Sequence, residues 1–207
     1  MNQLVSIHPV DPQPRLIERA ARVITEGGVL AYPTDSTYAL GCQLGDKGAL
    51  ERIRRIRRTE RDHEFTLVCR DLSEIASYAR VDNWAYRLLK ALTPGPYTFI
   101  LQATHEVPKR LQDPKRRSIG IRVPDNRIAL ALVDAVGEPI MSSTLLLPGD
   151  DRPLTEAEDI RDRLDNQLDM IIDGGASGLD PTTVVDLSQG EFTVVRQGKG
   201  DVSAFAS

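Results

Sequence analysis

Apolar residues recur along this chain at two spacings, which alternate from segment to segment. In residues 16–24 and 50–56 they return every three or four positions, as on the buried side of an amphipathic helix. Elsewhere they form short runs bounded by Gly, Pro or Asp, which is typical of buried strands. The pattern predicts helices over residues 16–24, 50–56, 71–79, 83–92, 127–136 and 157–164, and strands over residues 4–7, 29–32, 66–69, 97–101, 119–123, 139–143, 170–173, 183–187 and 192–196.

Strands and helices that interleave through the whole length indicate an α/β fold. The last two predicted strands follow each other without a helix between them, which makes the sheet mixed rather than wholly parallel. We therefore expect one large twisted mixed β-sheet flanked by helices. No internal repeat and no long linker divides the sequence, so residues 1–207 are expected to form a single domain with a loosely held tail over residues 198–207.

Composition narrows the class of protein. The 207 residues are 41% hydrophobic, enough for an ordinary domain that buries roughly 70% of its unfolded surface. A formal net charge of −4 argues against a generally basic nucleic-acid binder. The apolar stretches are far shorter than the roughly 20 residues that cross a bilayer, and residues 1–5 lack the basic start of a secretory signal. We expect a soluble, cytoplasmic protein with no membrane partner.

Cysteine and histidine show no metal-ligand pattern in this sequence. Cys42 and Cys69 belong to no CxxC pair, and His8, His63 and His105 are scattered without ligand spacing. We therefore expect no structural zinc, no disulfide framework and no permanent cofactor.

Two hydroxyl-rich segments follow predicted strands. Thr34 and Ser36 lie in the loop after the strand at residues 29–32, and Ser143 and Thr144 stand where the strand at residues 139–143 ends. Ligands of α/β proteins commonly bind at strand ends, so both segments are candidates for a phosphate or ribose site. Such residues also cluster in ordinary turns, where they bond their own backbone, and that structural role is about equally supported.

Arginine and lysine are concentrated in two clusters. Each cluster, one between residues 51 and 61 and one between residues 109 and 117, leaves a local charge of +4. A solvated helix face would explain the first, but guanidinium groups also suit bidentate phosphate recognition. If both clusters share one face, they form a positive patch for nucleotide phosphates or RNA. The candidate RNA-binding residues are Arg52, Arg54, Arg55, Arg58, Arg61, Lys109, Arg110, Lys115, Arg116 and Arg117.

Four segments occur in the order found in a known family: AYPTDSTYALG at residues 31–41, PGPYTFIL at 94–101, IGIRVP at 119–124, and TTVVD at 182–186 before Val195-Arg196. In these segments the chain resembles the YrdC/YciO family of threonylcarbamoyl-AMP synthase-like proteins, and it is most similar to the YciO branch. The resemblance implies a large twisted sheet with a concave, positively charged surface. It also implies a pocket for ATP, L-threonine and bicarbonate, which synthases convert to threonylcarbamoyl-AMP and pyrophosphate for tRNA modification.

The resemblance further implies which residues form the pocket. The Lys-x-Arg motif of the synthases falls on Arg57 and Thr59, and their Ser-x-Asn motif falls on Thr144 and Leu146. Thr59 carries no charge and Leu146 no hydrogen-bonding group, so the synthase motif is degenerate and altered activity is expected. The nucleotide- and substrate-binding candidates, from the resemblance and the strand-end loops together, are Thr34, Ser36, Arg57, Arg58, His63, Thr98, Arg122, Ser143, Thr144, Thr183 and Arg196.

Three functions remain open at the level of the sequence. The first is a nucleotide-pocket enzyme of the threonylcarbamoyl-AMP type, with ATP or an AMP-type nucleotide and L-threonine as partners and Mg²⁺ arriving with the ATP. The second is a protein that binds double-stranded RNA or tRNA without catalysis. The third is a helper protein whose arginines only solvate a helix. No residue is nominated as a catalytic nucleophile, because neither a GxSxG segment nor a His/Asp partner is present.

Overall fold

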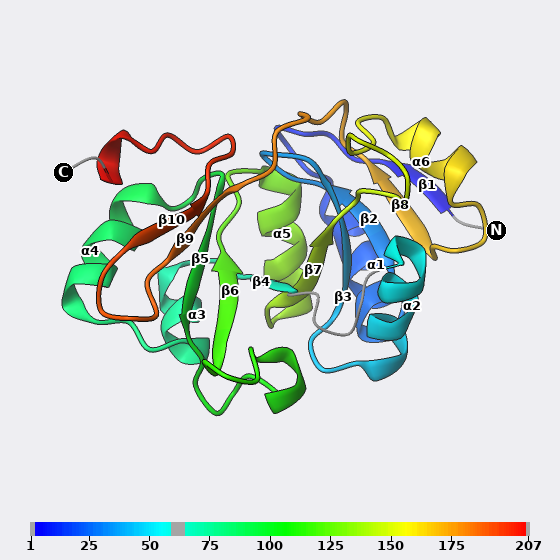
Figure 1. The fold of residues 1–207 in the computed structure, drawn as a ribbon. Coiled ribbons are helices and arrows are strands. Elements are labelled where there is room, and N and C mark those ends of the chain that lie inside the picture. Colours follow the sequence, from blue (N-terminus) through cyan, green and yellow to red (C-terminus); the bar gives the residue numbers. More distant parts are fainter. Residues whose placement is uncertain (1–2, 59–64, 206–207) are drawn as a thin grey trace.

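The computed structural model describes residues 3–58 and 65–205 and confirms the α/β fold (Figure 1). Within these residues, ten strands form one sheet in the order β1-β8-β2-β3-β7-β4-β6-β5-β9-β10. The strands are β1 (Gln3–Ser6), β2 (Leu30–Pro33), β3 (Tyr38–Gln43), β4 (Thr66–Val68), β5 (Tyr97–Gln102), β6 (Ser118–Arg122), β7 (Ile140–Thr144), β8 (Met170–Asp173), β9 (Thr183–Asp186) and β10 (Thr193–Arg196). The helices are α1 (Pro14–Thr25), α2 (Lys47–Arg57), α3 (Leu72–Tyr78), α4 (Asn83–Leu92), α5 (Arg127–Val136) and α6 (Ala157–Arg163), with short 3-10 helices η1 (Lys109–Leu111) and η2 (Ser203–Phe205).

The sheet is mixed, as the sequence predicts. Parallel pairs join β1 with β8, β2 with β8, β4 with β6 and β5 with β9, and the remaining neighbours are antiparallel. The last two strands, β9 and β10, form the antiparallel pair expected from their short connection. Strands distant in the sequence are therefore neighbours in the sheet, above all β3, β7, β4 and β6 at its centre.

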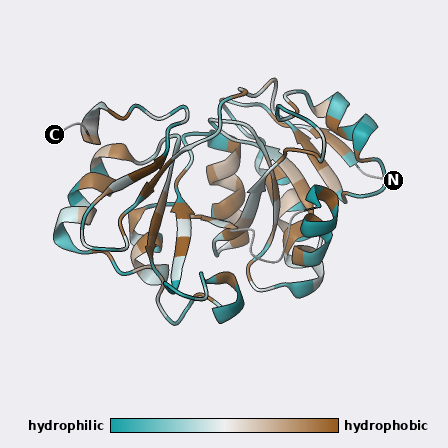
Figure 2. Cartoon of the chain, viewed as in Figure 1, coloured by the Kyte–Doolittle hydropathy of each residue, from teal (hydrophilic) through white to brown (hydrophobic). Residues whose placement is uncertain are grey.

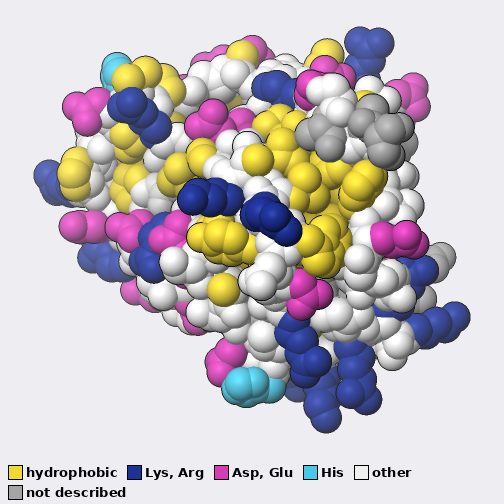
Figure 3. Space-filling view, turned by 90° about the vertical axis from the view of Figure 1, so that its left-hand side faces the viewer, with side chains coloured by type: hydrophobic (Ala, Val, Ile, Leu, Met, Phe, Trp, Pro, Cys, Tyr) yellow, Lys and Arg dark blue, Asp and Glu magenta, His cyan; other side chains and the backbone are white. Residues whose placement is uncertain are grey.

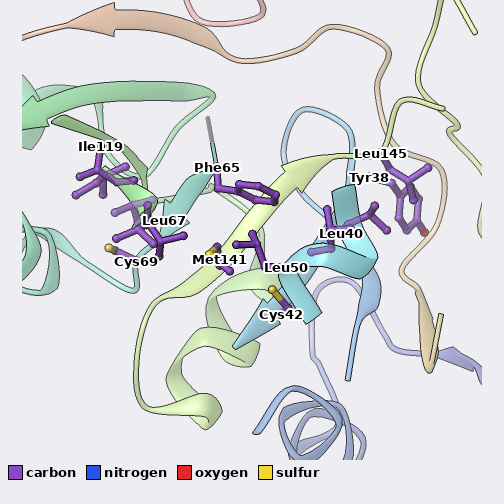
Figure 4. Packing of buried hydrophobic residues seen from close by; sticks show 14 of the residues in the cluster. Tyr38, Leu40, Cys42, Leu50, Phe65, Leu67, Cys69, Ile119, Met141 and Leu145 are labelled. Atoms are coloured by element: carbon purple, nitrogen blue, oxygen red, sulfur yellow. The ribbon is translucent and has the colours of Figure 1, made fainter. Parts of the chain in front are cut away.

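Helices pack on both faces of the sheet. Strand residues such as Leu30, Tyr32 and Ile140 pack with α1 and α5 in one apolar cluster. The alternate residues of the same strands form the other cluster with α2, α3, α4 and α6, and Figure 4 shows Leu40 and Met141 within it. The outward surfaces of α2 and α6 are hydrophilic, whereas most strands are hydrophobic (Figure 2). Two-sided burial explains why the strands read as continuous apolar runs.

One strand was not expected from the sequence. Residues 38–43 form β3, which lies between β2 and β7 in the centre of the sheet. A strand that is buried on both faces has no alternation of apolar and polar residues. Gly41 also interrupts the apolar run. Its backbone lies close to Tyr32, since a Cβ atom at this position would lie 2.9 Å from the Tyr32 ring. The segment therefore has no strand signal beyond its apolar composition.

The expectation of a loosely held tail is wrong for the described residues. The Tyr97 hydroxyl donates to the Asp201 carbonyl at 2.9 Å, and the Thr183 hydroxyl donates to the Gly200 carbonyl at 2.7 Å. Phe205 is buried, and its ring centroid lies 6.5 Å from that of Tyr97 and 5.5 Å from that of Phe192. These contacts hold the end of the chain against β5 and β9, because burying an aromatic ring stabilises the ordered state.

Candidate functional site

A cavity of about 830 Å³ opens on the sheet face that α1 and α5 cover elsewhere. Val68 and Ile140 belong to the apolar cluster of those helices. Thr66 and Ser142 lie on the same face of these strands, each two positions from Val68 or Ile140. These two residues line the cavity instead. The change from apolar to polar residues at alternate positions therefore turns a core surface into the floor of a binding site.

Gly120 keeps that floor open. It pairs with Thr66 of β4 and with Ile100 of β5, so it stands in the middle of the cavity-lining strands. A Cβ atom at this position would lie 3.3 Å from Cγ2 of Thr98 and 3.4 Å from Oγ1 of Thr66. A larger residue would fill space that is now available to a ligand.

Arg122 places a buried positive charge at the cavity. Only 7% of the residue is exposed, and its Nη2 atom forms an ion pair with Oδ1 of Asp35. Its Nη1 atom donates to Oγ of Ser36 at 3.2 Å, and Oδ2 of Asp35 accepts from the Asp125 N–H at 3.0 Å. The Nε–H group of Arg122 has no partner among the described residues. A buried donor of this kind is costly to leave unpaired.

Arg57 reaches the cavity from the C-terminal end of α2. Asp46 caps the start of the helix, because its carboxylate accepts from the Ala49 N–H at 2.9 Å. The apolar side of the helix is buried. The Arg57 guanidinium donates to Oγ of Ser143 at 2.5 Å and, through Nε, to the Leu146 carbonyl at 3.4 Å. Burial lowers the pKa of Arg57, but an arginine remains charged in proteins, so a partly desolvated cation is fixed beside β7.

Arg196 lines the other end of the cavity, on β10. Its Nη2 atom donates to the Thr182 carbonyl at 2.9 Å, and burial lowers its pKa as well. The hydroxyls of Thr98 and Thr182 lie 2.9 Å apart and share one hydrogen bond. Val184 and Pro181 line this end too, which gives it a more apolar character than the end at β7.

The structure brings together many of the residues predicted from the sequence and separates others. Those that line the cavity are Arg57, Thr98, Arg122, Ser143, Thr144 and Arg196. Arg58 is exposed and ends α2 in the left-handed conformation, with φ of 48°. Thr59, Arg61 and His63 lie outside the described residues.

Thr34, Ser36 and Thr183 stand behind or beside the cavity rather than on its lining. The Thr34 hydroxyl donates to the Thr37 carbonyl at 2.7 Å and accepts from the Ser36 N–H, which fixes the turn between β2 and β3. Ser36 receives its bond from Arg122. Thr183 bonds the tail through Gly198 and Gly200. In this structure the three hydroxyls therefore hold backbone or position Arg122.

The cavity also has lining residues that were not among the predicted binding residues, although Thr37 and Ser142 belong to the two hydroxyl-rich segments. They include Thr37, Thr66, Gly120, Ser142, Asp151, Arg152, Leu179, Asp180 and Thr182. For Thr66, Gly120 and Ser142 a signal was present, because each is a small or polar residue inside an apolar strand. For Asp151 and Arg152, which lie on the loop between β7 and α6, the local sequence offers no such signal.

The arginines of α2 do not share one face. Arg52 pairs with Asp169 at 2.7 Å, whereas Arg54 pairs with Glu51 at 2.6 Å and lies 5.7 Å from the ring centroid of Phe65. Arg57 turns into the cavity, and of the other arginines in residues 52–58, Arg55 and Arg58 are exposed. The described arginines of the first cluster therefore fall into three groups. Arg52 and Arg54 form ion pairs, Arg57 lines the cavity, and Arg55 and Arg58 face solvent.

The second basic cluster forms an exposed group around η1. All five basic residues of this cluster are exposed, and Arg116 also pairs with Asp186 at 3.0 Å. Arg110 donates to the Gly45 carbonyl, just before α2, so the two clusters are neighbours in space. Basic side chains gather at the bottom of the face in Figure 3, where the segment containing η1 lies in Figure 1.

The cavity suits an anion with a partly apolar body. Four arginines line it, and three of them, Arg57, Arg122 and Arg196, are each held by protein oxygens before any ligand enters. Preorganised donors of this kind lose little entropy when they bind phosphate or carboxylate oxygens. Among the described residues, no group of three or more His, Cys, Asp or Glu side chains is placed to hold a metal ion.

These features define a class of protein: a single-domain α/β protein whose mixed ten-stranded sheet carries an arginine-lined cavity. A family model described as "Telomere recombination", which groups Sua5, YciO and YrdC proteins, matches residues 22–198. The chain belongs to this Sua5/YciO/YrdC family. Across residues 3–58 and 65–205, each helix is too short or too polar to cross a bilayer.

Individual relatives agree with this assignment. The chain is 55% identical to YciO of Escherichia coli K12 over 205 residues, which are 99% of this chain and 100% of that protein. The crystal structure of E. coli YciO superposes with a TM-score of 0.95 over the same shares of the two chains. A threonylcarbamoyl-AMP synthase of Hydrogenovibrio crunogenus is 32% identical over 146 residues, 69% of this chain and 77% of the synthase.

A more distant structure contains a ligand. The P. abyssi Sua5 protein, crystallised in complex with L-threonine, superposes with a TM-score of 0.89 at 25% identity. The match covers 98% of this chain and 59% of the Sua5 chain. The fold of the present chain is thus similar to that of a protein that binds an amino acid.

Proposed function

We propose that the cavity binds an AMP-type nucleotide together with L-threonine, and that the protein acts on threonylcarbamoyl-AMP or forms it from ATP, L-threonine and bicarbonate. The relatives named a threonylcarbamoyl-AMP synthase and a Sua5 protein with L-threonine support this substrate class. The observation that carries the proposal is the unpaired Nε–H of the buried Arg122, in a cavity that Arg57 and Arg196 also line.

The residues of this chain would act by binding and alignment. Forming an adenylate from ATP and a carbamate needs no protein nucleophile, because the carbamate oxygen attacks the α-phosphate and pyrophosphate leaves. Arg57, Arg122 and Arg196 would neutralise the negative charges of these reactants, while Thr144 and Ser143 offer hydroxyls beside them. Mg²⁺ would arrive on the phosphates of ATP and supply further charge neutralisation.

Leu146 distinguishes this cavity from that expected of a synthase with its Ser-x-Asn motif intact. Its carbonyl holds Arg57, and the residue lines the cavity where an asparagine amide would otherwise offer a donor and an acceptor. We therefore propose that the pocket retains adenylate binding and that synthase turnover is weak.

Calorimetric titration with AMP, ATP and L-threonine tests the binding proposal. We expect saturable binding of the nucleotides, weakened at least ten-fold by Arg196→Gln, since one charge-assisted hydrogen bond contributes roughly 1.5–3 kcal/mol. Arg87→Gln is the matched control, because Arg87 is an exposed arginine on α4, away from the cavity. Pyrophosphate release that requires ATP, L-threonine and bicarbonate together would identify the reaction. Absence of nucleotide binding in the wild-type protein would refute the proposal.

A second candidate function rests on the basic group around η1. The exposed Lys109, Lys115 and Arg117, with Arg110 beside α2, would contact the backbone of double-stranded RNA or tRNA. RNA binding should then weaken steeply with salt, and the triple variant Lys109→Gln, Lys115→Gln, Arg117→Gln should reduce the salt dependence. A salt-independent affinity, or one that this variant leaves unchanged, would exclude such a surface.

A further inference from the structure

Arg152 differs from the other arginines of the cavity in having no protein partner. Arg57 is bonded to Ser143, Arg122 to Asp35, and Arg196 to Thr182. Within residues 3–58 and 65–205, nothing forms a hydrogen bond or ion pair with the exposed Arg152 side chain. Its full charge and all its donors are therefore available to a ligand.

The backbone that carries Arg152 is fixed on both sides. Before it, a turn closes through the Asp150 N–H and the Leu147 carbonyl at 3.1 Å, with Gly149 at φ of 83°. The Asp150 carboxylate then accepts from Nη2 of Arg163, at the end of α6, at 3.1 Å to each oxygen.

After Arg152, the segment is tied to a second stretch of chain that also lines the cavity. The Ser177 N–H donates to the Thr155 carbonyl at 3.0 Å, which joins the loop to the segment containing Leu179 and Asp180. Pro153, which also lines the cavity, restricts the backbone next to Arg152. The long Arg152 side chain thus extends, without a protein partner, from a fixed backbone, whereas the other three arginines are held by protein oxygens.

We infer that Arg152 is a further ligand-binding residue, whose guanidinium closes over the outer end of a bound polyphosphate and sets a preference for nucleotides with more than one phosphate. The inference rests on the proposed nucleotide function. It assigns the inner phosphate to the fixed arginines and the outer phosphates to Arg152, which lines the same cavity as Arg57, Ser143 and Thr144.

Asp151 and Asp180 also line the cavity, and their negative charges oppose this effect. Neither carboxylate forms an ion pair with another described residue, so each would repel an unscreened polyphosphate. The adjacent pair Asp151 and Arg152 therefore provides two variants of opposite sign: neutralising the arginine should weaken polyphosphate binding, and neutralising the aspartate should strengthen it.

The test is calorimetric titration of ATP and AMP, with Mg²⁺ held constant, into the full chain and its variants. Arg152→Gln should weaken ATP binding roughly ten-fold or more and AMP binding less than three-fold, because only the outer phosphates lose a charge-assisted contact. Asp151→Asn should shift the ratio of the two affinities in the opposite direction. Arg161→Gln on α6, which removes a partner of Asp162 away from the cavity, should leave both affinities unchanged.

Equal losses of ATP and AMP affinity in Arg152→Gln, or no loss of either, would overturn the inference while leaving nucleotide binding by the wild type intact. If the wild type binds no nucleotide, the proposed function fails, and inorganic pyrophosphate becomes the probe. Pyrophosphate binding that Arg152→Gln weakens would then support the role of Arg152. No pyrophosphate binding, or equal binding by the two proteins, would contradict it.

Discussion

Arg122 and Asp35 form an ion pair that is almost closed to solvent, with 9% of each side chain exposed. The pair joins the end of β6 to the turn between β2 and β3, and the same turn receives a bond from Arg122 to Ser36. Both carboxylate oxygens of Asp35 accept bonds, from Arg122 and from the Asp125 N–H, whereas Nε of Arg122 has no partner among the described residues. The ion pair therefore holds β6 to the turn between β2 and β3, and it leaves Nε–H of Arg122 without a protein partner.

Removing one partner of this pair should be costly. Asp35→Ala leaves the Arg122 charge buried, so we expect the free energy of unfolding in urea to fall by roughly 3–5 kcal/mol. The control is Asp162→Ala, which breaks an exposed pair with Arg161 and should cost less than about 1 kcal/mol. Similar losses for the two variants would mean that the Arg122–Asp35 pair is not effectively buried.

Adding a methyl group to the cavity floor should lower nucleotide affinity while changing the stability of the fold little. Gly120→Ala puts a Cβ atom 3.3 Å from Thr98, a contact that a small side-chain shift relieves, so we expect a stability change within about 1–2 kcal/mol. Nucleotide affinity should fall several-fold. Gly48→Ala adds the same methyl group near the start of α2, and calorimetry should find its affinity unchanged. A normal affinity for Gly120→Ala would place the ligand away from this floor.

The Thr183 hydroxyl is predicted to hold the tail rather than a ligand. It is fully buried and bonds both Gly198 and Gly200. Thr183→Val keeps the shape but leaves a buried N–H and a carbonyl unpaired, so unfolding should require roughly 1–3 kcal/mol less. Thr193→Val, on the exposed strand β10, should change stability little. If Thr183→Val keeps its stability but loses nucleotide affinity, the residue contacts the ligand instead.

Alkaline pH should destabilise the fold through Tyr32. Burial raises the pKa of Tyr32 from 10.0 to about 12. The folded state therefore holds its proton more tightly than the unfolded state, so the stabilisation is complete below about pH 10 and is lost as the pH rises toward about 12. Two pKa units correspond to roughly 2–3 kcal/mol. Urea unfolding of the wild type should show this extra loss relative to Tyr32→Phe, and parallel pH profiles would contradict the assignment.

The sequence predicts most of the elements of this fold because their signals are local. The apolar spacing of α1 and the Pro and Gly residues at its ends identify that helix within a few residues. The strand β3 has no such signal, since it is buried on both faces and its neighbours β2 and β7 are set by long-range pairing. The tail is ordered by Tyr97, about a hundred residues earlier in the chain, a contact that no local pattern encodes.

The cavity residues likewise divide into those that the sequence identifies and those that only the order of the strands brings together. Arg57 and Arg122 are identifiable from the sequence through the resemblance, but that Gly120 stands between Thr66 and Ile100 follows only from the order of β4, β6 and β5. Likewise, six arginines within residues 52–61 suggest one basic surface, yet a helix rotates successive side chains by 100° and distributes them around its axis. Their separate partners became apparent only in three dimensions.

A crystal structure of the protein with AMP tests the central claim most directly. The nucleotide should lie in the cavity between Arg57 and Arg196, with an oxygen of its phosphate within hydrogen-bond distance of Nε of Arg122. An AMP molecule bound elsewhere on the surface, with Nε of Arg122 still unpaired in the cavity, would contradict the account.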